Sequence, residues 1–424
     1  MNVLRWFTMP GLFVLAGLLL SACGQAGRDV TQPPTPLSTA PVSPEVTAPP
    51  SSEPVSGLEA QPDDPRCQAQ VAQQGVRFNV SGWKTNFCRH SVDYTEILSG
   101  GPPPDGIPPL DTPKFESVAE ADAWLKPNEP VISFRLGDEA RAYPLQVLIW
   151  HEIVNDVVGG RPVAVTFCPL CNAAIVFDRR VNGQVLRFGT TGNLRYSDLI
   201  MWDDQTESWW QQFAGEAIVG DMAGTRLEFL PAQIVAWADF KAAFPQGQVL
   251  SRDTGYLRSY GRNPYTGYDR IDRPPFLFFD GTLDDRLPPM ARVVAVAVGE
   301  AIKAYPFSTL SQVYVINDVV AGRPLVVFWE GGTASALDKG DIAASRDVGS
   351  TAVYERSLDG QTLTFTWDRT AFQDQETGST WNLFGQATAG PLAGKSLRSV
   401  LSHEYFWFAW AAFRPDTVIY RPDS

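Results

Sequence analysis

Short runs of alternating hydrophobic and polar residues dominate the chain after residue 130, and this alternation is typical of β-strands. Residues 131–137 and 140–144 predict two strands joined by a tight polar turn. The same layout returns at 293–299 and 302–306. Because a whole run of elements recurs, the pattern predicts an internal repeat.

Later segments of the two copies match as well. Each copy contains a strong hairpin signal, Asn-Gly at 182–183 and Asp-Gly at 359–360, because both turn positions need positive φ. Each copy then ends in an aromatic segment, 231–244 or 402–413, which we interpret as a closing helix before a proline.

These features predict an α+β fold with two tandem homologous β-rich units, each closed by a C-terminal helix. The first repeat covers residues 131–250 and the second covers 293–424. The segment between them, 251–292, holds several tyrosines among glycines and arginines. A plain linker is less aromatic, so we expect this segment to pack between the repeats or to form one wall of a pocket.

The N-terminus has the form of an export signal. Residues 1–22 combine a basic start, an apolar stretch and small residues before Cys23. The tetrapeptide at 20–23 resembles the bacterial lipoprotein box, which implies a lipid on Cys23 and a bacterial extracytoplasmic location. Residues 23–66 are rich in proline and poor in large apolar residues, so they predict a disordered tether.

Charge and hydrophobicity narrow the choice of partners. The 424 residues include 34 basic and 47 acidic side chains, a net charge of −13, which disfavours binding to nucleic acid. After the signal, no apolar run is long enough to cross a bilayer. We therefore expect the N-terminal lipid to be the only attachment to the membrane.

Cysteines are the main candidates for chemistry, and the chain has five. Outside the cytoplasm thiols tend to be oxidised, so an exported cysteine is a disulfide, a metal ligand or a redox group. With Cys23 lipidated, we expect Cys67 and Cys88 to pair within a polar N-terminal extension, 67–130. This leaves one C-x-x-C pair, at the end of a predicted strand, to explain.

Comparison of the two repeats singles out that pair. Cys168 and Cys171 correspond to Glu330 and Thr333 in the second repeat, so only the first repeat carries the thiols. Residues present in both repeats serve the shared fold, whereas chemistry present in one repeat is a candidate for function. The sequence therefore predicts a functional site at the thiol pair.

Other candidates lie near the pair in the sequence. The first repeat alone carries His151 and Glu152, and we expect His151 to open a strand that pairs with the thiol-bearing strand. Arg179 is a candidate for lowering a thiol pKa. Asp203 and Glu207 are candidate proton carriers, although a similar polar pattern in the second repeat favours a structural role.

Three interpretations of the pair stay open. As a redox pair, Cys168 or Cys171 attacks a disulfide or peroxide and the other thiol resolves the product, with no cofactor and with a redox partner protein. As a metal site, the two thiolates and His151 bind a soft ion, copper or zinc. In the third interpretation the thiols form a structural disulfide in a binding or scaffold protein.

Four stretches around these candidates resemble one bacterial family. They are 166–171 with the thiol pair, 151–156 before it, and 206–209 and 253–256 after it. In combination they are similar to domain-of-unknown-function family 3179, most closely over residues 130–268, which identifies the chain as an exported lipoprotein member. The resemblance brings no established activity, and the second repeat departs from the thiol motif.

Overall fold

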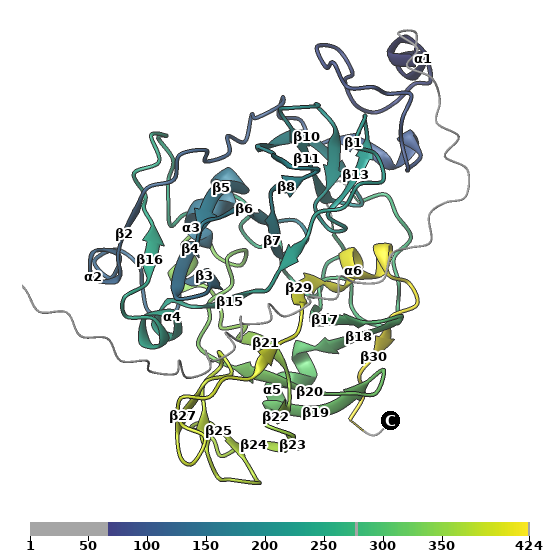
Figure 1. Ribbon diagram of the computed structural model, residues 1–424. Coiled ribbons are helices and arrows are strands. Elements are labelled where there is room, and N and C mark those ends of the chain that lie inside the picture. The colour runs from purple at the N-terminus through teal and green to yellow at the C-terminus, as the bar shows by residue number, and fades with distance from the viewer. Residues whose placement is uncertain (1–66, 276–278, 423–424) are drawn as a thin grey trace, which may run out of the picture. The chain divides into compact units, whose positions relative to one another are not determined.

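Short strands, most of them paired antiparallel, are the main regular secondary structure of the protein, as the alternating pattern predicts (Figure 1). The computed structural model describes residues 67–275 and 279–422, which belong to one compact unit, Val46–Ser424. The fold is α+β and β-rich, with few and short helices.

The predicted signal peptide, the lipidation site Cys23 and the tether at 23–66 lie outside the described residues. Within the part of the chain that is described, no helix is both long and apolar enough to span a membrane.

Three sheets build the first half of the described chain, up to residue 250. The first sheet contains, in hydrogen-bonded order, β1 (Ile97–Ser99), β10 (Phe188–Arg195), β11 (Asp198–Asp203), β12 (Trp209–Gln211) and β13 (Glu216–Val219). The second contains β14 (Phe229–Leu230), β7 (Ala173–Asp178), β6 (Arg161–Cys168) and β5 (Ile153–Val158). The third contains β15 (Ala232–Ala236), β3 (Pro130–Leu136), β4 (Glu139–Pro144), β16 (Gln248–Leu250) and β2 (Phe115–Ser117).

Three sheets of the second half follow the same strand orders, without counterparts of β1 and β2. One contains β24 (Phe365–Trp367), β25 (Phe372–Asp374), β26 (Thr380–Trp381) and β27 (Ala387–Ala389). The next contains β28 (Arg398–Ser399), β21 (Ser350–Glu355), β20 (Arg323–Glu330) and β19 (Val315–Val320). The last contains β29 (Ser402–Phe406), β17 (Arg292–Val298), β18 (Ala301–Pro306) and β30 (Val418–Ile419).

The two predicted Gly-containing turns each close a small hairpin. β8 (Arg180–Val181) pairs with β9 (Gln184–Val185), and β22 (Ser357–Leu358) pairs with β23 (Gln361–Thr362). The turn residues between the strands all have positive φ, from 49° at Asn182 to 82° at Gly360. This conformation matches the twist of the flanking strands and explains the choice of Asn, Asp and Gly.

Helices are short. They are α1 (Cys67–Gln73), α2 (Val118–Ala121), α3 (Leu145–His151), α4 (Trp237–Ala243), α5 (Phe307–Val313) and α6 (Trp407–Phe413), with 3₁₀ turns η1 (Tyr94–Glu96) and η2 (Ile342–Ala344). Each of α2 to α6 directly follows a strand, whereas α1 lies apart from the strands in the N-terminal extension. Ser117 and Glu120 form a capping box at the start of α2.

The helices predicted to close each repeat are shorter than expected. Residues 232–236 form β15 and 402–406 form β29, so each helix begins only after a strand. The strands prevail because β15 pairs with β3 and β29 pairs with β17, each over five residues. A further strand follows each helix, so neither helix closes its half of the fold.

The hydrophobic core is continuous across the two halves. Its largest cluster of buried side chains includes Val165 of β6 and Ile175 of β7 together with Phe406 and Trp407 of the second half. All six residues of β7 and the last six of β6 are buried. The end of β6, which carries the predicted site, therefore lies inside the protein.

Two further segments flank this core. Cys67 and Cys88 form a disulfide with their Cα atoms 5.3 Å apart, within the N-terminal extension. Between the halves, the carboxylate of Asp269 is fully buried and pairs with Arg292 at 3.0 Å and Arg346 at 2.7 Å. Buried charges of this kind need such partners, so the ion pairs fix this segment to the second half.

Candidate functional site

The hairpin of β6 and β7 positions the two thiols. β6 runs through apolar and β-branched residues, which suit a buried strand, and ends at Cys168. A turn at 169–172 brings the chain back to Ala173, opposite Cys168, and Cys171 lies within this turn. Both cysteines are free, and their exposed fractions are only 2% and 0%.

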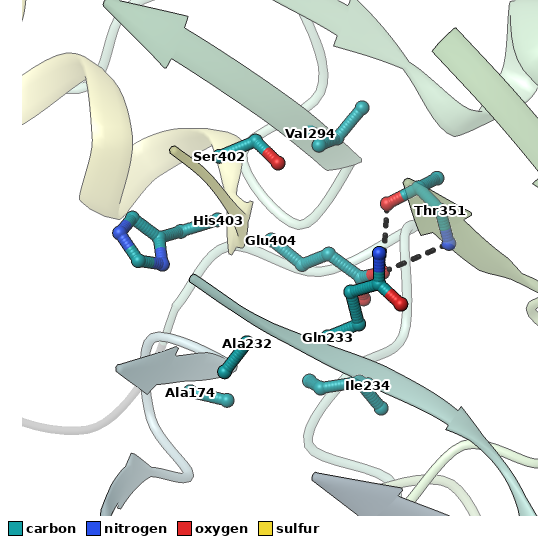
Figure 2. A pocket seen from close by; sticks show the side chains of 9 residues that line it. All are labelled: Ala174, Ala232, Gln233, Ile234, Val294, Thr351, Ser402, His403 and Glu404. Atoms are coloured by element: carbon teal, nitrogen blue, oxygen red, sulfur yellow. Dashed lines mark hydrogen bonds between the residues drawn. The ribbon is translucent and has the colours of Figure 1, made fainter. Parts of the chain in front are cut away.

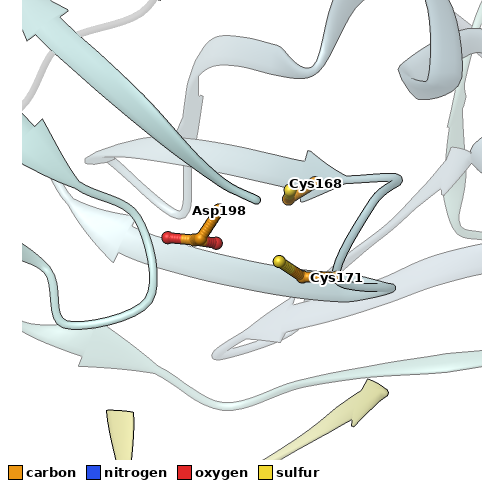
Figure 3. Close-up of side chains that lie close together, drawn as sticks. All are labelled: Cys168, Cys171 and Asp198. Atoms are coloured by element: carbon orange, nitrogen blue, oxygen red, sulfur yellow. The ribbon is translucent and has the colours of Figure 1, made fainter. Parts of the chain in front are cut away.

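A third side chain meets the thiols from another sheet. Asp198 is the first residue of β11 and is fully buried. One ligand atom from each of Cys168, Cys171 and Asp198 can be chosen so that all three lie within 4.8 Å of one another (Figure 3). The Cys168 thiol also donates to the carbonyl of Ser197 at 3.6 Å, which connects the end of β6 to the approach of β11.

The two oxygens of Asp198 have different surroundings. Oδ2 accepts hydrogen bonds from the Phe213 N–H at 2.9 Å and from the Gln211 side chain at 2.5 Å. Oδ1 has no N–H or O–H donor among the described residues, and the thiol of Cys171 is the hydrogen-bonding group that remains for this carboxyl group. Burial raises the pKa of Asp198 to about 7, although these hydrogen bonds favour the ionised form. A thiol is only a weak donor, so a buried carboxylate oxygen that has no other donor favours a bound cation or a proton.

Ionisation of the Cys171 thiol is also unfavourable when no cation is bound beside it. Burial raises its pKa well above the usual value, and the neighbouring Cys168 and Asp198 raise it further. A thiol of this kind keeps its proton at neutral pH and is a poor nucleophile. A cation held between these groups reverses the preference, because metal ligands bind in their deprotonated form.

A second buried carboxyl group lies close by. Burial raises the pKa of Glu152 to about 8, and the negative charge of Asp198 adds to the increase. Glu152 directly follows α3 as its C-cap, with a strained φ of 58°, and Tyr314 at the same place after α5 has a φ of 63°. The strain therefore belongs to the shared fold, whereas the carboxyl group belongs to the first half alone.

Aromatic residues from outside the hairpin cover the thiols. The Tyr268 hydroxyl donates to the carbonyl of Leu170 at 3.1 Å, and the Phe406 N–H donates to the carbonyl of Cys171 at 2.9 Å. Three tyrosines have a pKa raised mainly by burial and further by the thiols or their neighbouring carboxyl groups: Tyr265, Tyr268 and Tyr405. The segment between the halves and β29 therefore both contribute walls to the site.

The structure places His151 outside this group. Its Nδ1 lies 2.7 Å from the carbonyl of Pro108 and its Nε2 lies 2.6 Å from the hydroxyl of Tyr260, so both ring nitrogens are occupied. The reason is local. His151 is the last residue of α3 instead of the first residue of a strand, since β5 begins only at Ile153. Asp198 takes the position in the ligand group that the sequence assigned to His151.

The other predicted residues make structural contacts. Arg179 donates to the carbonyls of Val163, Leu186 and Asp156, and Glu207 accepts from the N–H of Lys84. These bonds to backbone groups use the hydrogen-bonding capacity of both side chains. Neither residue belongs to the ligand group of Cys168, Cys171 and Asp198.

Asp203 has the same contacts as its counterpart in the second half. It accepts from the Thr206 N–H at 2.6 Å and from the Trp210 indole at 2.8 Å. Asp374 accepts from Thr377 and Trp381 at 2.6 and 2.9 Å. This agreement supports a structural role for Asp203, because the second half lacks the thiols.

Sequence reasoning overlooked Asp198, although a signal was present. In the β10–β11 hairpin the pairing begins at Phe188 and Asp203 and continues to Arg195 and Asp198. The counterpart hairpin, β24–β25, is paired at only three positions. Asp198 lies in the extra length of the first hairpin. The same comparison of halves that isolated the thiols would therefore have isolated this carboxylate.

A second buried polar cluster lies where β29, β15 and β21 meet (Figure 2). Glu404 accepts hydrogen bonds from the N–H and hydroxyl of Thr351, while burial raises its pKa to about 7. Burial lowers the pKa of His403 to about 4, although a hydrogen bond to the backbone of Ala174 opposes the shift. The cavity here has a volume of about 10 Å³. This space holds at most one water molecule.

The fold and this site define a class of protein: a β-rich α+β domain with one thiol–carboxylate centre buried between its two halves. The chain belongs to the family described as "Protein of unknown function (DUF3179)", which matches residues 104–417. The match covers most of the chain and includes both halves. Among curated proteins no significant match was found, and none was found among solved structures.

Proposed function

We propose that the protein binds one zinc ion through Cys168, Cys171 and Asp198. The observation that carries this proposal is the buried ligand group itself, with ligand atoms within 4.8 Å of one another and with one carboxylate oxygen that has only a thiol as a donor. Buried carboxyl groups are normally hydrogen-bonded, paired with a positive charge or bound to a metal. A cation satisfies all three groups at once.

The donor set favours zinc over copper. Two thiolates suit either Zn²⁺ or Cu⁺, but a carboxylate oxygen is a poor ligand for Cu⁺ and a common one for Zn²⁺. The charges agree with this choice. Two thiolates and one carboxylate carry three negative charges. A divalent ion leaves one of these charges uncompensated, whereas a monovalent ion leaves two. Each uncompensated buried charge costs several kcal/mol.

Elemental analysis of the purified, reduced full-length protein tests this proposal. We expect about one equivalent of zinc per chain, retained through gel filtration and removed by a strong chelator. Asp239→Asn is the matched control, because burial also raises the pKa of Asp239, to about 6, but Asp239 is not in the ligand group. A reduced, folded protein that does not take up zinc from solution contradicts the proposal, and so does one that takes up copper or iron in preference to zinc.

Thiol–disulfide exchange is the second candidate function. Two observations favour it, namely two free thiols close together and a carboxylate beside Cys171 that can accept its proton. The pair loses two electrons and two protons to a partner disulfide or to a peroxide, which becomes a dithiol or water, and a Cys168–Cys171 disulfide forms. Burial of both sulfur atoms disfavours attack on a protein partner.

Mass measurement with and without reductant separates the candidates. A disulfide that forms and is reduced readily supports exchange. Free thiols with bound zinc support the metal site. A disulfide that resists reduction in the folded protein supports a structural role in a binding or scaffold protein.

We also propose that the protein is exported and lipid-anchored, with the lipid on Cys23. The support is the signal-like composition of residues 1–22 and the small residues before the cysteine. Metabolic labelling with a fatty-acid analogue should mark the wild-type protein and not Cys23→Ala. Equal labelling of the two, or soluble cytoplasmic protein, contradicts the anchor.

We further infer that the two halves arose by duplication. Each of three sheets in the first half has a counterpart in the second half with the same strand order. The centre then belongs to the first copy, since Glu330 and Thr333 replace the thiols in the second. This asymmetry supports a function for the thiols beyond folding.

A further inference from the structure

The segment 252–268, here called the strap, crosses the thiol centre. It has no regular helix or strand. Two of its aromatic residues face the centre. Tyr268 is 1% exposed and donates to the carbonyl of Leu170 inside the C-x-x-C turn. Tyr265 packs against the core cluster that contains both thiols. An ion or reagent that reaches the sulfur atoms from this side has to displace the strap.

One end of the strap is firmly attached. Asp269, the next residue after it, is fully buried and bound by Arg292, Arg346 and the hydroxyl of Ser335 at 2.5 Å. Breaking up such a buried charged network is costly. The backbone N–H groups of Asn263 and Gly267 also donate to the carbonyls of Gly340 and Asp338 in the second half, so any movement of the strap turns about its 263–269 end.

The middle of the strap is held by His151. The carbonyl of Pro108 only accepts hydrogen bonds, so Nδ1 of His151 carries the proton and Nε2 is the acceptor. The Tyr260 hydroxyl, 2.6 Å away, must then donate to Nε2. The hydroxyl of Thr254, 2.5 Å from that of Tyr260, completes a chain of hydrogen bonds with a single direction.

The rest of the strap is attached to the first half through side chains. Arg252 donates to the Gln146 side chain and lies over the ring of Trp124, Asp253 forms an exposed ion pair with Lys114, and the carbonyl of Arg262 accepts from the Trp150 indole at 3.1 Å. Between these points Tyr256 is 44% exposed and Leu257 is 99% exposed. Segments with much exposed surface and few buried contacts open at low free-energy cost compared with the core.

We infer that the strap is the gate to the thiol centre and that the Tyr260–His151 hydrogen bond holds it closed. The inference rests on the proposed function only for the identity of the ion. The strap covers the same two thiols whether the protein binds zinc or exchanges disulfides. It also gives His151, which the first half alone carries, a positioning role that the ligand group does not.

Alkylation of the two thiols tests the gate in metal-free, reduced protein with the Cys67–Cys88 disulfide intact. Tyr260→Phe removes one hydroxyl and keeps the ring. We expect it to raise the alkylation rate of Cys168 and Cys171 by a small neutral reagent about three- to tenfold, the effect of one lost hydrogen bond on an opening equilibrium. Tyr268→Phe, which loses the bond to Leu170, should act in the same direction.

The control is Tyr94→Phe, which loses an equivalent buried hydrogen bond to the carbonyl of Phe87 at 2.6 Å, far from the strap in sequence. Local opening exposes little surface, so the faster alkylation should depend only weakly on low concentrations of urea. A Tyr260→Phe rate no higher than that of the wild type or of Tyr94→Phe overturns the inference. A faster rate with the steep urea dependence of global unfolding overturns it as well.

Failure of the gate and failure of the zinc proposal give different results. The alkylation rates are measured without metal, so they do not change if the centre binds no zinc. If zinc binds, Tyr260→Phe should also release it faster to a chelator, by a similar factor. Zinc content that is normal with unchanged alkylation and release rates leaves the metal proposal intact and removes the gate.

Discussion

Replacing Asp198 with asparagine is expected to weaken zinc binding by more than about 100-fold while the protein stays folded. Mutation of a residue that only hydrogen-bonds a metal ligand typically lowers metal affinity about 10- to 100-fold, and loss of a charged ligand itself should lower it further. The asparagine carbonyl can still accept from Phe213 and Gln211, as Oδ2 does now. Its amide, however, places a donor where Oδ1 faces the thiols. Competition with a chromophoric chelator measures the affinity.

Asp239→Asn provides the comparison, because it removes another buried acid without touching the ligand group. Cys168→Ser should lose binding at least as strongly as Asp198→Asn. Wild-type affinity in Asp198→Asn would remove the carboxylate from the centre and leave only the two thiols as ligands.

Raising the pH from about 6.5 to about 8.5 is expected to destabilise the metal-free protein by roughly 3 kcal/mol. Burial raises the pKa of Asp198 and Glu404 to about 7 and that of Glu152 to about 8. The folded protein therefore binds protons in this range that the unfolded chain has already lost. Stability from such groups is full below their unfolded pKa, near 4, and disappears as the pH passes their folded values. Urea unfolding at several pH values measures the slope.

Zinc should reverse the direction of this effect. Its ligands bind deprotonated, so zinc affinity and the stability it confers rise over the same pH range. The window avoids the buried histidines: burial lowers the pKa of His403 to about 4, so its contribution is complete above about pH 6.5 and is lost only as the pH falls.

Variants of the acids identify the groups responsible. Asp198→Asn and Glu152→Gln should each flatten the pH dependence of the metal-free protein, because neither replacement can ionise. If the metal-free protein keeps its stability up to pH 8.5, these carboxyl groups do not hold protons in the folded state.

The sequence was a good guide to local structure. The Asn-Gly and Asp-Gly turns form the predicted hairpins, because a positive φ at these positions depends on the turn residues themselves. It was less reliable where two local preferences compete. Residues 232–236 and 402–406 were predicted as the starts of helices, but pairing with β3 and β17 makes them strands.

The site shows the same division. The sequence alone determined that a thiol pair stands at the end of a strand, that only the first half carries it, and that β-strands dominate, because these properties follow from local pattern and from comparison within the chain. Only the tertiary structure decided that Asp198 joins the thiols, that His151 instead holds Tyr260, and that the centre is buried. The physical reason is that strand register and hairpin length in separate sheets decide which side chains meet, and no local pattern contains that information.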